Sequence, residues 1–123
     1  MDAMVEAVSA KLRAPGACNE GFLRDEAILV VTFITDDDGV EDMNTAQETY
    51  DALVAAKGGD SDRIVMLGLI PGNGCAKGGQ HWAQLIGLFG MHGIQGEVCS
   101  LDYNTFFQSA VGTILDTCVI NPG

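Results

Sequence analysis

Two uninterrupted apolar runs constrain the fold of this chain more than any other feature of its sequence. They are AILVVTFI, from Ala27 to Ile34, and RIVMLGLI, from Arg63 to Ile70. Neither run alternates apolar with polar residues, and the first is rich in β-branched side chains, which is typical of strands covered on both faces in a parallel sheet. Both runs are therefore predicted to be buried strands.

Helical patterns flank and separate the two runs. Met1, Met4, Val5, Val8 and Leu12 recur at intervals of three and four residues, which predicts a helix that RAPG ends. Between the runs, NTAQETYDALVAAKGG predicts a second helix. Asn44 is its expected N-cap, with Gln47 at the capping-box position and Gly58 at its end.

After the second run, the chain predicts a helix, a short third strand and a last helix. The strand is expected around Gly96 to Cys99, and Asp102 is the expected N-cap of the last helix. The order α-β-α-β-α-β-α predicts a three-layer α/β/α fold, Rossmann-like, with a parallel sheet of about three strands and right-handed crossovers. The apolar helical positions are Trp82, Leu85, Ile86 and Phe89, then Phe106, Phe107, Ala110, Val111, Ile114 and Leu115.

Length and charge limit the possible classes of function. The 123 residues, 47% of them hydrophobic, suit a single domain over residues 1–123. The net charge of −11 argues against nucleic acid and anionic membranes as partners. No apolar run approaches the roughly 20 residues of a membrane-spanning helix, and MDAMVEAVSA lacks the pattern of a signal peptide. We expect a soluble chain without an export signal.

Three consecutive acids, Asp36, Asp37 and Asp38, directly follow the first apolar run. Ligands of open α/β sheets gather at the carboxyl ends of strands, and adjacent carboxylates repel one another unless a cation offsets their charge. Because Mg²⁺ and Ca²⁺ prefer oxygen ligands, one hypothesis is a metal site at these residues. The alternative is a solvated acidic turn in which Gly39 supplies the bend and the acids approach the start of the next helix.

An enzymatic alternative rests on the same residues. A hydrophobic strand followed by D-x-D-G-V resembles the opening signature of the haloacid dehalogenase-like phosphatases. That resemblance implies Asp36 as the nucleophile and Asp38 as the general acid/base of a Mg²⁺-dependent reaction. The second motif of the family requires Ser or Thr after the next strand, where this chain has LIPG. The alternative therefore depends on the first motif alone.

The four cysteines are Cys18, Cys75, Cys99 and Cys118. In an oxidising compartment they allow two disulfides in three possible pairings. The other interpretation is four reduced thiols, and spacing does not decide between the two.

Three segments resemble one known family. GFLRDEAILVVTFITDDDG, YDALVAAKGGDSDRIVMLGLI and VCSLDYNTFFQSAVGTILDTC are similar to the C-terminal half of von Willebrand factor A-like domains, in particular a group in exported bacterial proteins. Thr35-Asp36 matches one corner of the metal-ion-dependent adhesion site of that family, whereas the DxSxS strand and the loop threonine have no counterpart. The resemblance implies a truncated domain over residues 1–123, a non-enzymatic binding module whose incomplete site holds Mg²⁺ or Ca²⁺ weakly.

The resemblance implies two further properties. Since the relatives are exported, we expect a disulfide, with Cys75 and Cys99 as the pair. Since the neighbouring strand of the family is missing, the outer edge of Ala27–Ile34 is expected to be open, which invites pairing with a second copy into a six-stranded sheet. The expected partners are therefore a second copy and a protein ligand.

Overall fold

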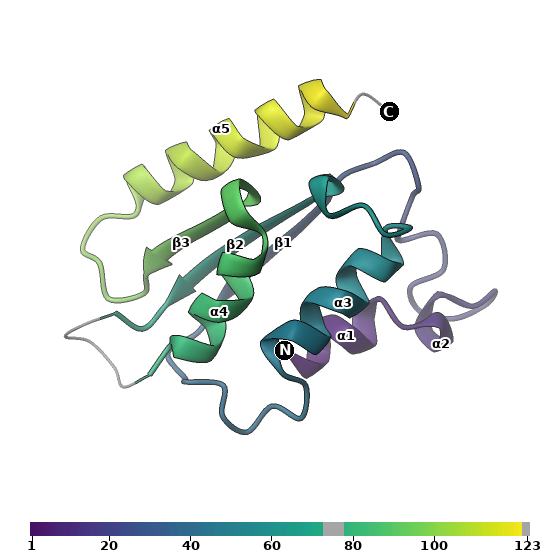
Figure 1. Cartoon of the computed structure of the whole chain (residues 1–123), viewed down its shortest axis with the longest axis horizontal. Helices are drawn as coiled ribbons and strands as arrows, with labels where there is room; N and C mark the ends of the chain where they lie inside the picture. The colour runs from purple at the N-terminus through teal and green to yellow at the C-terminus, as the bar shows by residue number, and fades with distance from the viewer. Residues whose placement is uncertain (73–77, 122–123) are drawn as a thin grey trace.

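Three parallel strands form the central layer of the computed structural model, which describes residues 1–72 and 78–121 (Figure 1). They are β1 (Leu29–Ile34), β2 (Ile64–Ile70) and β3 (Gly93–Glu97), in the order β1-β2-β3. In register, Leu29 pairs with Ile64 and Met66 pairs with Gly93. The helices are α1 (Asp2–Ala7), α2 (Ala10–Arg13), α3 (Ala46–Ala56), α4 (Gln80–Leu88) and α5 (Asn104–Ile120), with short 3₁₀ turns η1 (Ser61–Arg63) and η2 (Gly90–His92).

The helices divide unequally between the two faces of the sheet. Helices α1, α3 and α4 lie on one face, and α5 lies alone on the other (Figure 1). The crossovers through α3 and α4 share a face, as right-handed connections require for this strand order. The predicted α/β class with a three-stranded parallel sheet is confirmed.

The two faces of β2 hold two separate cores. Ile64, Met66 and Ile70 pack toward α3 and α4, where Leu53, Leu85 and Ile86 are buried. On the opposite face, Val65, Leu67 and Leu69 pack with Phe106 and Ala110 of α5. All seven residues of β2 are buried.

Strand β1 departs from the prediction that both of its faces are covered. Leu29 is buried, but Val30 is 38% exposed and Ile34 is 66% exposed. The reason is that α5 packs against β2 and β3 and leaves one face of β1 bare. The prediction that both faces are covered is confirmed for β2 and wrong for β1. Composition alone cannot show which of the two strands lies at an edge.

Two predicted helix starts each shift by one residue. The capping box of α3 is formed by Thr45 and Glu48, because Asn44 donates both its backbone N–H and its side-chain amide to Asp2. Helix α5 begins at Asn104, whose N–H donates to Asp102 Oδ1 at 2.8 Å.

The first predicted helix and the third strand also differ in extent. The helix breaks after Ala7, and Ser9 caps the short α2 by accepting the N–H of Leu12. Strand β3 begins at Gly93, where a Cβ would lie 2.1 Å from the carbonyl oxygen of Ile86. Because glycine is not a β-forming residue, the start of this strand is not recognised from its sequence. Within residues 1–72 and 78–121, no helix has the length and apolarity needed to cross a bilayer.

Candidate functional site

The three acids predicted as a metal site lie in the turn that follows β1, and the carboxylates of two of them accept hydrogen bonds from backbone N–H groups of this turn. Thr35 Oγ1 accepts the N–H of Asp37 at 3.1 Å. Asp37 Oδ1 accepts the N–H of Asp38 at 2.6 Å, and Asp38 Oδ1 accepts the N–H of Val40 at 3.2 Å. The carboxylates of Asp37 and Asp38 therefore stabilise a turn, as Asp side chains commonly do.

The described part of the chain contains no group of three or more metal-ligating side chains close enough to hold an ion. Asp36 is exposed. Asp42, farther along the same loop, pairs with the ammonium of Met1 at 3.0 Å. The observed bonds match the solvated-turn alternative, and weak Mg²⁺ or Ca²⁺ binding at Asp36, Asp37 and Asp38 stays a prediction.

The acidic turn rests on the only tryptophan of the chain. Gly39 is buried with φ of +71°, and a Cβ there would lie 2.9 Å from Nε1 of Trp82. Trp82 also stacks against Phe33 of β1, with ring centroids 4.9 Å apart. The indole therefore fixes the position of the turn relative to the sheet, and its fluorescence can report on both.

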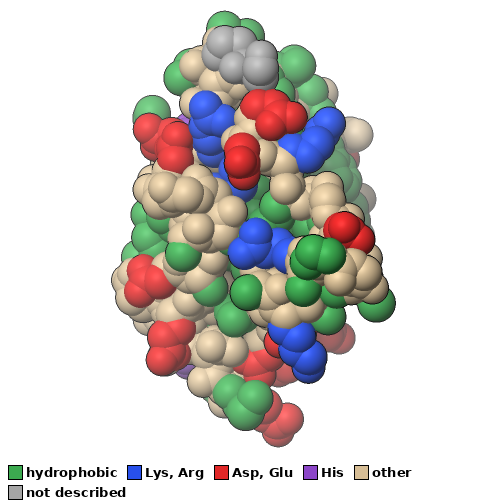
Figure 2. Space-filling model, turned by 90° about the vertical axis from the view of Figure 1, so that its right-hand side faces the viewer, with side chains coloured by type: hydrophobic (Ala, Val, Ile, Leu, Met, Phe, Trp, Pro, Cys, Tyr) green, Lys and Arg blue, Asp and Glu red, His purple; other side chains and the backbone are tan. Residues whose placement is uncertain are grey.

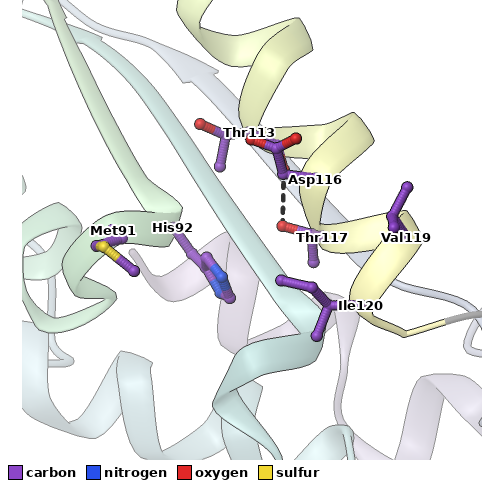
Figure 3. A pocket seen from close by; sticks show the side chains of 7 residues that line it. All are labelled: Met91, His92, Thr113, Asp116, Thr117, Val119 and Ile120. Carbon is purple, nitrogen blue, oxygen red and sulfur yellow. Dashed lines mark hydrogen bonds between the residues drawn. The ribbon is translucent and has the colours of Figure 1, made fainter.

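A cavity of about 410 Å³ lies between η2 and the C-terminal half of α5 (Figure 3). His92 enters it from η2, opposite Thr117 and Ile120 (Figure 3). Thr117 Oγ1 already donates to the carbonyl oxygen of Thr113 at 2.7 Å. No hydrogen bond or ion pair joins His92 to Asp116 in the described structure, so the cavity presents no paired nucleophile and base. Its lining residues are Met91, His92, Thr113, Asp116, Thr117, Val119 and Ile120.

The cysteines fall into two groups. Cys18 and Cys118 are free and exposed, whereas Cys99 is disulfide-bonded. Cys75 lies outside the described residues, so the predicted pairing of Cys75 with Cys99 stays a prediction.

The outer edge of β1 carries backbone groups that no described strand pairs. Thr35 donates its N–H to the carbonyl oxygen of Leu69 at 3.0 Å, toward β2. Because successive residues of a strand direct their backbone groups to opposite sides, Val30, Thr32 and Ile34 direct theirs away from β2. The edge thus offers three N–H and three C=O groups for pairing with another strand.

A groove of about 400 Å³ runs along this edge between β1 and α1. Ala3, Met4 and Ala7 form its helical wall, and Phe22, which is 57% exposed, lies beside it. Strand β1 lines the groove from Leu29 to Phe33 without a charged side chain. An open edge beside a helix is the arrangement in which proteins bind an added strand.

The other edge of the sheet is protected against strand addition. Strand β3 has five residues, and two of them, Gln95 and Glu97, are polar and exposed. The carbonyl oxygen of Glu97 also accepts the N–H of Ser100 at 3.1 Å. Short length and charge are the usual defences of an edge strand, and β1 has neither a charge nor a proline.

Basic side chains gather at the end of the molecule where the strands begin (Figure 2). Lys57 is buried there, and its Nζ donates to the carbonyl oxygens of Arg24, Asp25 and Ala27. Burial lowers the pKa of Lys57, and its three acceptors offset the cost of desolvation. The described basic residues are Lys11 and Arg13 of α2, Arg24 of the loop before β1, Lys57 at the end of α3 and Arg63 of the turn before β2.

Sequence reasoning found the open edge and the acidic turn but missed the groove and the basic end. Both depend on how α1, α2 and the loop before β1 fold back on the sheet. The comparisons with protein-family models, curated proteins and solved structures find no match for this chain.

Proposed function

We propose that this protein is a non-enzymatic, von Willebrand factor A-like interaction module that self-associates through the outer edge of β1. The observation that carries the proposal is the unprotected edge at Val30, Thr32 and Ile34, beside an apolar groove. The Thr35-Asp36 corner at the end of β1 supports the family assignment. An exposed, apolar and uncharged edge strand is a template for pairing with another strand.

Antiparallel pairing about a two-fold axis at Thr32 suits the edge best. In that register Thr32 faces Thr32 of the second copy, and Val30 faces Ile34. Thr32 with Thr32 and the two Val30–Ile34 pairs on either side of it are hydrogen-bonded pairs, because these residues direct their N–H and C=O groups outward. The three pairs give about six hydrogen bonds across the seam. Apolar pairs then flank a Thr–Thr pair, a favourable cross-strand combination.

The distribution of charge favours this orientation over a parallel one. Antiparallel pairing places the acidic turns Asp36–Asp38 of the two copies at opposite ends of the seam. Parallel pairing would place two acidic turns side by side in a chain whose net charge is already −11. The antiparallel orientation therefore keeps the two acidic turns apart.

The test of the proposal is the mass of the protein in solution, with two proline variants as a matched pair. Thr32→Pro removes an outward N–H and should give a folded monomer by light scattering. Val31→Pro removes an N–H that points toward β2 and should unfold the protein. If both variants lose the ordered fold, as judged by Trp82 fluorescence, a lysine variant, Ile34→Lys, tests in their place whether disrupting the edge gives a folded monomer.

A cross-link identifies the seam directly. In a background with Cys18 and Cys118 replaced by serine, Thr32→Cys should give an intermolecular disulfide under oxidising conditions, because residue 32 faces itself across the axis. Leu101→Cys, at an exposed position of the loop before α5, is the control and should not cross-link. A wild-type protein that stays monomeric at high micromolar concentration would rule out the proposal.

A further inference from the structure

The cavity between η2 and the end of α5, which we call the η2–α5 cavity, has a size suited to a small molecule. Its volume of about 410 Å³ falls in the range of about 300–1,000 Å³ that is typical of ligand pockets. Its walls come from two segments that are distant in the sequence, η2 before β3 and the last two turns of α5 (Figure 3). None of its described lining residues belongs to β1 or α1, so the cavity is separate from the β1 edge.

Exposed apolar side chains gather around this cavity. Met91 is 89% exposed, Val119 is 80% exposed and Ile120 is 72% exposed, which makes them three of the five most exposed large hydrophobic residues of the described chain. Single exposed apolar residues are common, whereas several around one hollow are typical of a binding surface. The thioether of methionine also makes favourable contacts with aromatic rings. The rim therefore suits an apolar body, and an aromatic one best.

The helical wall of the cavity is electronegative. Asp116, one turn before the end of α5, is the only charged residue of the helix, and the last turn of α5 carries no basic side chain. The last carbonyl oxygens of a helix give its C-terminus a partial negative charge, which favours a cation there and disfavours a carboxylate. Since no basic side chain is among the described lining residues, the carboxylate and the helix end meet no counter-charge inside the cavity.

Two polar side chains of the cavity are available to a ligand. The carboxylate of Asp116 and the imidazole of His92 make no hydrogen bond or ion pair within residues 1–72 and 78–121, whereas the hydroxyl of Thr117 is already bonded to the carbonyl oxygen of Thr113. A primary ammonium carries three N–H donors, so a single group can donate to a carboxylate and to an imidazole nitrogen. A bare metal ion fits less well, because the described side chains include no group of three metal ligands.

We propose that the η2–α5 cavity binds a small organic cation, a primary ammonium carried on an aromatic body. The ammonium lies at the end of α5, where Asp116 and His92 accept its N–H groups. The aromatic body lies against the apolar rim of Met91 and Ile120. This inference goes beyond the proposed function, because the cavity takes no part in pairing through the β1 edge and is open in a monomer and in an edge-paired dimer.

Four probes of similar build test which features of the ligand matter. Phenethylammonium should bind with about millimolar affinity or better, and amide chemical shifts of His92 and Asp116 should move in an NMR titration. Phenethyl alcohol lacks the charge, phenylacetate reverses it and ethylammonium lacks the ring, so each should bind at least about tenfold more weakly. Equal binding of any of these three, or unchanged shifts at both residues with phenethylammonium, would overturn the proposal.

A matched pair of variants tests the role of Asp116. Asp116→Asn keeps the shape of the side chain and should weaken phenethylammonium binding about tenfold or more, since a hydrogen bond to a charged group is lost. Glu6→Gln removes the same charge from α1, on the other face of the sheet, and should leave the affinity unchanged. Trp82 fluorescence checks that both variants are folded. Equal affinities of wild type and Asp116→Asn, or equal losses in the two variants, would contradict the site, whatever the mass of the protein in solution.

Discussion

The ammonium of Lys57 donates a hydrogen bond of 2.6 Å to the carbonyl oxygen of Ala27. This bond joins the end of α3 to Ala27, two residues before β1, across 30 positions of the sequence. The same ammonium binds the carbonyl oxygens of Arg24 and Asp25. The three N–H groups of the ammonium thus have three carbonyl oxygens as acceptors, and these bonds fix the loop before β1 where the chain enters the sheet.

Replacing Lys57 with methionine should destabilise the protein by about 1–3 kcal/mol, because three carbonyl oxygens lose their donor at a site where the lysine is buried. The control is Lys11→Met, since Lys11 is 84% exposed and its only ion pair is 4.0 Å long. That control should change stability by less than about 0.5 kcal/mol. Urea unfolding followed by Trp82 fluorescence measures both. Equal midpoints would contradict the role of Lys57.

Stability should fall at acid pH because two carboxylates hold the start of α3. Asp2 accepts the N–H groups of Met43 and Asn44, and Glu48 accepts that of Thr45. These bonds lower the pKa of Asp2 below 3.8, chiefly through Met43, and the pKa of Glu48 below 4.5, chiefly through Thr45. The unfolded chain therefore binds protons first as pH falls, and the stabilisation present above pH 4.5 is lost through the lowered native values.

The double variant Asp2→Asn, Glu48→Gln should therefore show a flatter dependence of stability on pH in the acid range. Glu6→Gln, on the same helix as Asp2, serves as the control, because the exposed carboxylate of Glu6 makes only a 4.0 Å ion pair, with Lys11, among the described residues. Thermal unfolding at a series of pH values measures the three slopes. If the control shows a slope as flat as that of the double variant, the dependence of stability on pH does not come specifically from Asp2 and Glu48.

Gly39→Ala should destabilise the protein by about 1–3 kcal/mol, since its φ of +71° disfavours a side chain and a Cβ would meet Trp82 at 2.9 Å. Gly87→Ala provides the opposite case. Gly87 lies inside α4 with nothing within 4 Å of a new Cβ, so alanine should stabilise the helix by about 0.5–1 kcal/mol. Melting temperatures that shift in the same direction for both would contradict the geometry of the turn.

Cation binding, if it occurs at the acidic turn, should be weak and should depend on Asp36. The carboxylates of Asp37 and Asp38 already accept backbone N–H groups, and Mg²⁺ does not give up its waters for few ligands. Titration with Mg²⁺ and Ca²⁺, monitored by Trp82 fluorescence and calorimetry, should show millimolar affinity or none, lost in Asp36→Ala. Binding that survives Asp36→Ala but not Asp38→Ala would mean that Thr35-Asp36 is not the metal corner of the von Willebrand factor A-like family. A generic phosphate-ester assay tests the phosphatase alternative separately.

The order of elements follows from local patterns, and for that reason it could be read from the sequence. The strand at Ile64–Ile70 is predicted by its continuous apolar run. The helix over Ala46–Ala56 is predicted by the spacing of its apolar residues and by its capping residues. The position of a strand within the sheet is not local. Ala27–Ile34 and Ile64–Ile70 are equally apolar, yet only the second is covered on both faces.

The candidate surfaces divide in the same way. An edge at β1 was expected from the resemblance, and the structure places β1 at an edge. The groove depends on α1 lying beside β1, and the bare face of β1 depends on where α5 crosses the sheet. Neither position is encoded in the spacing of residues along one segment. From the sequence, Phe107, Val111 and Leu115 are apolar helical positions like those of the core, although the structure leaves all three exposed.

The alternation of backbone direction along β1 should be readable in amide hydrogen exchange. The N–H groups of Val31 and Phe33 point toward β2 and should exchange slowly in any folded state. Those of Val30, Thr32 and Ile34 point outward and should exchange fast in a monomer and in a dimer formed through any other surface. Only a partner strand can slow them. A residue-by-residue exchange profile over these five amides therefore reports whether the edge of β1 is occupied, without altering a single side chain.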